Sequence, residues 1–206
     1  MKKIIGILVL MVSVTVTAQS KYEKGMQKAF SLWQANKITE ASQLFERIAN
    51  AEKQNWLPAY YVATIEITSS FGVKEEAVLD AKLKKAQTFL DKASAISPKN
   101  PEIIINQALL NTAYIAFDGQ KYGMTLSQKN NQLYSEALSL APKNPRVILG
   151  KAEWDMGAAQ FFGQSTEPYC KDVVKALALF EEEKLPKFYP SYGKQRAEEI
   201  IKKCKS

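Results

Sequence analysis

The chain has 206 residues, 46% of them hydrophobic, and a formal net charge of +7 at pH 7. It contains no histidine and only two cysteines, which excludes nucleophiles activated by histidine, most zinc sites and a four-thiolate metal site. No compact block of lysine and arginine interleaved with aromatic residues is present, so the modest basic excess favours acidic partners or anionic surfaces over nucleic acid.

Residues 1–18 have the pattern of a cleaved secretory signal peptide. Lys2 and Lys3 precede an apolar run over residues 4–14, and Val16-Thr17-Ala18 supplies the small residues for cleavage before Gln19. An uncleaved membrane anchor is the alternative, but the run is shorter than the roughly 20 residues that cross a bilayer. Neither cysteine lies near the cleavage site, so no lipid anchor is expected. We predict a periplasmic or secreted protein without stable membrane insertion.

From residue 22 onward, the apolar residues recur at spacings of three and four, and no segment shows sustained alternation. This periodicity predicts an all-α fold. Breaks between helices are expected at residues 36–37, 55, 72, 98–101, 119, 142–145, 163 and 186. At the break over residues 98–101, Pro101 suits the first turn of the next helix, so the two helices should be antiparallel neighbours.

A twelve-residue segment of the sequence recurs 44 residues further along the chain. Residues 91–102 correspond to residues 135–146, with Ala93 matching Ala137 and Pro98 matching Pro142. Such self-similarity at a fixed period is typical of stacked helical repeats.

Small and large apolar residues recur in the same order in successive helix pairs. The matching residues are Ala29, Leu32, Ala41, Phe45 and Ile48; then Ala63, Ala86, Leu90, Ala93 and Pro98; then Ala108, Tyr134, Ala137 and Pro142; and finally Ala152, Ala176 and Phe180. This order resembles the tetratricopeptide repeat (TPR) family. The resemblance implies a right-handed superhelical stack of about four antiparallel helix pairs with a C-terminal capping helix, as a single domain over residues 19–206.

The spacing departs from the family, whose repeat is about 34 residues long. In the second to fourth pairs, we expect the extra residues to lengthen the first helix and the turn that follows it. These turns share a Phe-Gly pattern in Phe71-Gly72, Phe117-Asp118-Gly119 and Phe161-Phe162-Gly163. A glycine that ends each helix in the left-handed conformation explains the pattern. A rim of Phe-Gly turns around a ligand is the alternative.

No motif for catalysis accompanies the repeats. The consecutive carboxylates Glu75-Glu76, Glu181-Glu182-Glu183 and Glu198-Glu199 would fan out around a helix instead of converging on one point. Gly150-Lys151 lacks the upstream glycine of a phosphate-binding loop. We therefore predict that the protein is not an enzyme, with no catalytic residues, no metal and no cofactor.

The two cysteines lie at helix ends that can meet. Cys170 falls near the start of one helix, and Cys204 falls at the end of a closing helix expected from about Pro190 to Lys203. If these helices pack antiparallel in an oxidising compartment, the cysteines can form a disulfide. Two unpaired buried thiols are the alternative.

A stack of helix pairs exposes a concave surface that suits an extended peptide or a helix of a partner. The candidate binding residues on this surface are Trp33, Tyr60, Thr64, Leu109 and Glu153. We predict a protein-protein interaction scaffold of the cell envelope that binds a protein or peptide in the concave groove. The alternative is an envelope module that binds a small ligand or glycan with the Phe-Gly turns at one rim.

Overall fold

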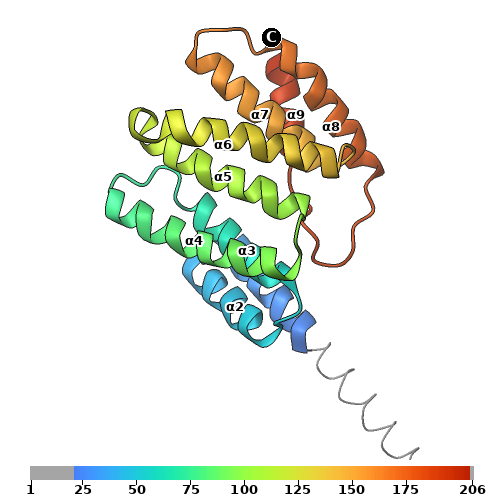
Figure 1. Ribbon diagram of the computed structural model, residues 1–206. Coiled ribbons are helices and arrows are strands. Elements are labelled where there is room, and N and C mark those ends of the chain that lie inside the picture. The colour runs from blue at the N-terminus through green and yellow to red at the C-terminus, as the bar shows by residue number, and fades with distance from the viewer. Residues whose placement is uncertain (1–20, 205–206) are drawn as a thin grey trace, which may run out of the picture.

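The computed structural model describes residues 21–204, and every regular element among them is helical (Figure 1). Residues 21–34 form an N-terminal helix that packs on α2 (Ile38–Ala51). Three antiparallel pairs follow: α3 (Trp56–Thr68) with α4 (Glu76–Ile96), α5 (Pro101–Phe117) with α6 (Gly119–Leu140), and α7 (Pro145–Phe161) with α8 (Cys170–Glu182). A short 3₁₀ turn, Glu167–Tyr169, precedes α8, and α9 (Lys194–Cys204) packs on α8.

The helix pairs stack in chain order, which confirms the predicted all-α fold of the TPR-like solenoid type. Within residues 21–204, no helix is both long enough and apolar enough to cross a bilayer. The predicted signal peptide, residues 1–18, lies outside the described residues.

The repeated segment marks the starts of α5 and α7. The side chains of Asn100 and Asn144 each accept a hydrogen bond from the backbone N–H two residues ahead, at 3.0 and 2.9 Å. Pro101 and Pro145 occupy the first turn of their helices. An asparagine cap satisfies a free donor at a helix start, and a proline loses no helical hydrogen bond there. The segment is therefore a signal for ending one helix and starting the next.

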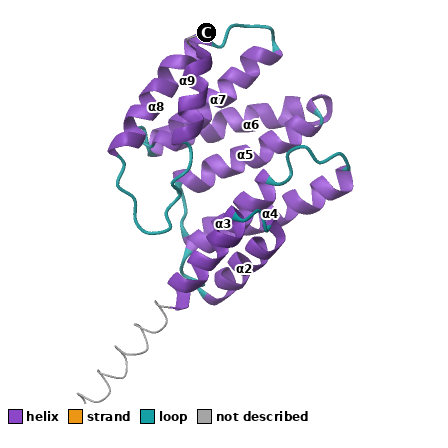
Figure 2. Ribbon diagram, turned by 180° about the vertical axis from the view of Figure 1, so that it is seen from behind, coloured by secondary structure: helices purple, strands orange, loops and turns teal. Residues whose placement is uncertain are grey.

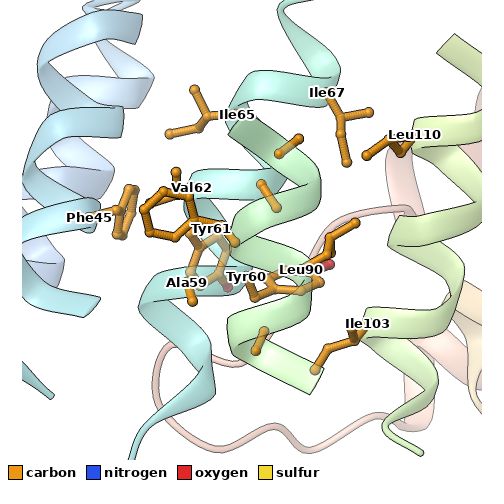
Figure 3. Close-up of a cluster of buried hydrophobic side chains, with 14 of the residues drawn as sticks. Phe45, Ala59, Tyr60, Tyr61, Val62, Ile65, Ile67, Leu90, Ile103 and Leu110 are labelled. Carbon is orange, nitrogen blue, oxygen red and sulfur yellow. The ribbon is translucent and has the colours of Figure 1, made fainter. Parts of the chain in front are cut away.

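The small residues of the repeat are buried in the core. Ala93 and Ala137 are completely buried, and alanine at a helix crossing lets two backbones approach closely. Around α3, Phe45 from α2, Tyr61 from α3 and Leu90 from α4 form one apolar cluster (Figure 3). Helix α3 is buried along most of its length because α2, α4 and α5 all pack on it.

The lengthened repeats differ from expectation in two ways. The longest helices are the second members of their pairs, since α4 and α6 have 21 and 22 residues whereas α3 and α5 have 13 and 17. Gly72 and Gly163 have positive φ angles of 83° and 67°, as a left-handed helix end requires. Gly119 instead begins α6, and Asp118 caps that helix by accepting a hydrogen bond from the N–H of Lys121 at 3.0 Å. The cap prediction was therefore wrong for the middle turn.

Residues 183–193 form a loop that runs from α8 back to the first helices before α9 begins (Figures 1 and 2). We name it the return loop. Phe188 stacks on Phe30 of the N-terminal helix with ring centroids 6.0 Å apart, and its carbonyl accepts a hydrogen bond from the Tyr61 hydroxyl at 2.8 Å. The closing helix starts at Lys194 and not near Pro190 as predicted. The return loop thus ties the last helix pair to the first two.

Candidate functional site

A large groove lies among α5, α6, α7 and the segment formed by the end of the return loop and the start of α9. Its volume is about 1610 Å³, whereas pockets for drug-sized ligands occupy roughly 300–1,000 Å³. Ile105 and Leu109 of α5 and Leu149 of α7 give it apolar walls. Its size and lining therefore suit a large and mostly apolar ligand.

Exposed apolar side chains gather at this groove. Among residues 21–204, the large hydrophobic side chains that remain exposed are Phe71, Val78, Met124, Leu140, Phe161, Phe162, Val174 and Tyr192. Five of these eight line the groove, namely Phe71, Met124, Phe161, Phe162 and Tyr192. Met124 is 92% exposed, Phe161 80% and Phe162 71%, and the two phenylalanine rings meet edge to face at 5.1 Å. A patch of this kind marks a binding surface.

The antiparallel pairing explains why these side chains meet at one end of the groove. Phe71 follows the end of α3, Phe161 ends α7, and Met124 lies near the start of α6. The end of each first helix lies beside the start of its partner, so the turns of successive pairs share one edge of the stack. Two of the three Phe-Gly turns contribute their phenylalanines to the groove, whereas Phe117 packs on the core.

Two hydrogen-bonded pairs of polar side chains join the helices that line the groove. The guanidinium of Arg196 on α9 donates to Glu153 of α7 at 2.7 Å. The indole N–H of Trp154 donates to Asn131 of α6 at 2.8 Å. The Tyr134 hydroxyl is neutral at physiological pH, and burial raises its pKa further above the usual value. The groove therefore has polar and charged groups from α7 and α9 beside its apolar walls.

A buried ion-pair network reaches the groove at Arg146. Arg146 of α7 donates from Nε to Glu102 of α5 at 2.9 Å and from Nη1 to Glu183 of the return loop at 2.8 Å. Asn144 also donates to Glu102, at 2.6 Å. Burial raises the pKa of the Glu102 carboxyl, and the charge of Arg146 opposes that rise. Through this network one arginine holds α5, α7 and the return loop together.

The disulfide fixes α9, which forms one wall of the groove. The Sγ atoms of Cys170 and Cys204 are 2.01 Å apart, so the predicted pair is bonded in the structure. The bridge joins the start of α8 to the end of α9. Residues 21–204 contain no group of three or more His, Cys, Asp or Glu side chains placed to hold a metal ion.

The structure brings together two of the five residues predicted to bind. Leu109 and Glu153 both line the groove. Tyr60 and Thr64 are buried and do not face an open surface, because α5 and the return loop cover α3. Trp33 packs on the rings of Phe45 and Tyr61. That Leu109 and Glu153 contact a ligand stays a prediction.

The sequence patterns did not point to Met124 or to the start of α9 as parts of the site. The sequence did carry a signal for Phe161 and Phe162, because it places two aromatic residues at a helix end beside a glycine. That pattern also fits a helix cap packed on its own helix. Only the exposure of both rings separates the two readings.

Comparison with known proteins establishes the fold. The sequence matches no family model and no curated protein. Solved structures that share the fold include the HusA haemophore from Porphyromonas gingivalis, with a TM-score of 0.78 and 23% identity over 89% of this chain and 92% of that chain. They also include a thermophilic TPR protein from Thermus thermophilus, with a TM-score of 0.57 and 12% identity over 97% of this chain and 95% of that chain. At these identities the likeness is one of fold, and the chain has a TPR-like helical-repeat fold.

Proposed function

We propose that this protein is an exported, non-catalytic binding protein that holds a flat, mostly apolar small molecule in the groove, and that this molecule is a porphyrin such as haem. The observation that carries the proposal is the gathering of five exposed apolar side chains around a groove of about 1610 Å³. The fold shared with a haemophore supports the choice of a tetrapyrrole.

The groove residues fit such a ligand by their chemistry. The rings of Phe161 and Phe162 can stack on or abut a conjugated ring, and Met124 supplies an adaptable, polarizable contact. Burial of these side chains against the ligand would remove apolar surface from water, at roughly 25 cal/mol per Å². Because the chain contains no histidine, affinity is expected to depend on contacts with the ring and not on a histidine bond to iron.

The disulfide supports export, since such bonds persist in oxidising compartments. Binding without catalysis agrees with the lack of any nucleophile paired with a base among the motifs of the sequence. The protein would therefore carry or present its ligand unchanged.

A protein segment is the second candidate occupant of the same groove. The TPR-like fold favours protein partners, and an apolar groove can hold the apolar face of a helix. If a partner peptide and a porphyrin both bind the groove through Phe161 and Phe162, they should compete with each other for the protein.

The test is a titration of the oxidised protein with haemin and, separately, with metal-free protoporphyrin. Binding should shift the porphyrin absorption band and quench the fluorescence of Trp154, which lines the groove. Both ligands should saturate the protein at micromolar concentrations or below. No saturable binding of either porphyrin would refute the proposal.

A pair of matched variants locates the site. Replacing Phe161 and Phe162 by serine should weaken porphyrin binding about tenfold to a hundredfold, because two aromatic contacts are lost. Val174→Ser is the control, since Val174 is also exposed but lies outside the groove. Equal affinities of the wild type and the double serine variant would contradict the assignment of the groove.

A further inference from the structure

Three glycines of the groove serve no need of the fold itself. Gly119, Gly123 and Gly157 all line the groove. None of them has a positive φ angle, and a Cβ atom added to any of them would meet no atom within 4 Å. Neither backbone conformation nor close packing therefore requires glycine at these positions.

The other glycines among residues 21–204 have a structural reason. Gly72, Gly163 and Gly193 have positive φ angles. A Cβ atom on Gly25 or Gly150 would lie 3.2 Å from a neighbouring side chain. The three glycines without such a reason all line the groove, where Gly150 and Gly193 also lie.

Gly123 and Gly157 lie inside α6 and α7, where glycine destabilises a helix relative to alanine. Gly157 and Phe161 are four residues apart and so share a face of α7, while Gly123 precedes the exposed Met124 on α6. Bare backbone therefore lies beside the exposed apolar side chains that mark the site.

We propose that Gly123 and Gly157 determine the specificity of the groove for flat ligands, because their exposed backbone lets the face of a planar ring lie directly against α6 and α7. This inference rests on the proposed function and adds which atoms the ring contacts. A side chain at either position would hold the ring away from the helix, since even a methyl group stands out from the backbone surface. Glycine is the residue that permits a close approach of backbone to a ligand.

The test replaces Gly123 and Gly157, singly, by alanine and by leucine and measures haemin affinity and thermal midpoint. Haemin affinity should fall modestly with alanine and at least tenfold with leucine. The thermal midpoint of the ligand-free protein should rise or stay unchanged, because both residues favour helix and meet open space. Ser135, exposed on α6 and outside the groove, is the control, and its alanine and leucine variants should bind haemin with wild-type affinity.

The outcomes separate this inference from the proposed function. If the wild-type protein binds no porphyrin, both the proposed function and this inference are refuted. Wild-type binding together with unchanged affinity in the leucine variants overturns the inference and leaves the proposed function standing. A lower thermal midpoint in the variants also overturns it, because the glycines would then have a packing role. As a second readout, the ring current of bound metal-free protoporphyrin should shift the amide resonances of Gly123 and Gly157 more than that of Ser135.

Discussion

Replacing Arg146 tests how much its buried ion pairs stabilise the fold. Its side chain is 1% exposed and pairs with Glu102, which is completely buried, and with Glu183, which is 17% exposed. Arg146→Met keeps an unbranched chain of similar length and removes the charge. The variant leaves the Glu102 carboxylate buried, with Asn144 as its one remaining hydrogen-bond donor among residues 21–204.

The expected loss of stability is large. Removing one partner of a buried ion pair costs about 3–5 kcal/mol, because the remaining charge stays out of water without compensation. A domain of this size is stable by about 5–15 kcal/mol in total. Arg146→Met should therefore lose a large fraction of the free energy of unfolding, and the return loop should lose its attachment to α7.

The loss should depend on pH in a defined direction. Burial already raises the pKa of Glu102 above its ordinary value of 4.5 while Arg146 opposes the rise, so the variant should raise that pKa further. Above pH 4.5 the folded state then binds more protons than the unfolded state, and stability falls as pH rises until the pKa of the folded state is passed. Acidification from pH 8 towards pH 5 should therefore return part of the lost stability.

Urea denaturation at several pH values between 5 and 8 measures this effect. Lys143→Met is the matched control, since Lys143 is an exposed cation near Arg146 in the sequence and its loss should change stability little. Adding Glu102→Gln to Arg146→Met should remove the pH dependence and recover stability. A midpoint of Arg146→Met equal to that of wild type at every pH would refute the reasoning.

Three further predictions concern single contacts. Gly193→Ala should destabilise the protein by about 2–4 kcal/mol in thermal denaturation, because Gly193 has φ +112° and its Cβ would lie 2.6 Å from Cζ of Phe180. A wild-type midpoint for this variant would show that the return loop can shift freely. Ala137→Leu should cost about 1–3 kcal/mol by overpacking a helix crossing, and an unchanged urea midpoint would contradict the close approach of α5 and α6. Reduction of the Cys170–Cys204 disulfide should lower the free energy of unfolding by up to about 4 kcal/mol and speed hydrogen exchange mainly in α9. Equally faster exchange along the whole chain would contradict a local stabilising effect of the disulfide on α9.

Local sequence patterns were sufficient to predict the helical pairs and their stacking. Ala93 and Ala137 are completely buried among packed helices, and Asn144-Pro145 both caps and starts a helix. These requirements act within one or two helices, so they leave a periodic trace in the sequence. The disulfide was predictable for the same reason, since Cys170 and Cys204 lie at the ends of neighbouring helices.

The groove was only partly predictable. The positions of Leu109 and Glu153 on the first helices of their pairs correctly predicted that they line the groove. Tyr60 occupies a comparable position and is buried. The difference arises from the return loop, whose Tyr192 hydroxyl accepts a hydrogen bond from Tyr60 at 3.2 Å. A contact between residues 132 positions apart leaves no periodic signal, because it depends on where α8 ends and how the loop folds back.

The sequence alone determined a stack of helix pairs, since helix periodicity, caps and small crossing residues are local properties. The tertiary structure decided which surface stays open. The return loop covers the face of α3, and α9, held by its disulfide, closes one side of the groove. Phe161 and Phe162 remain exposed at the end of α7. Their sequence is the same whether the rings pack on their own helix or face a ligand, and only long-range contacts distinguish the two.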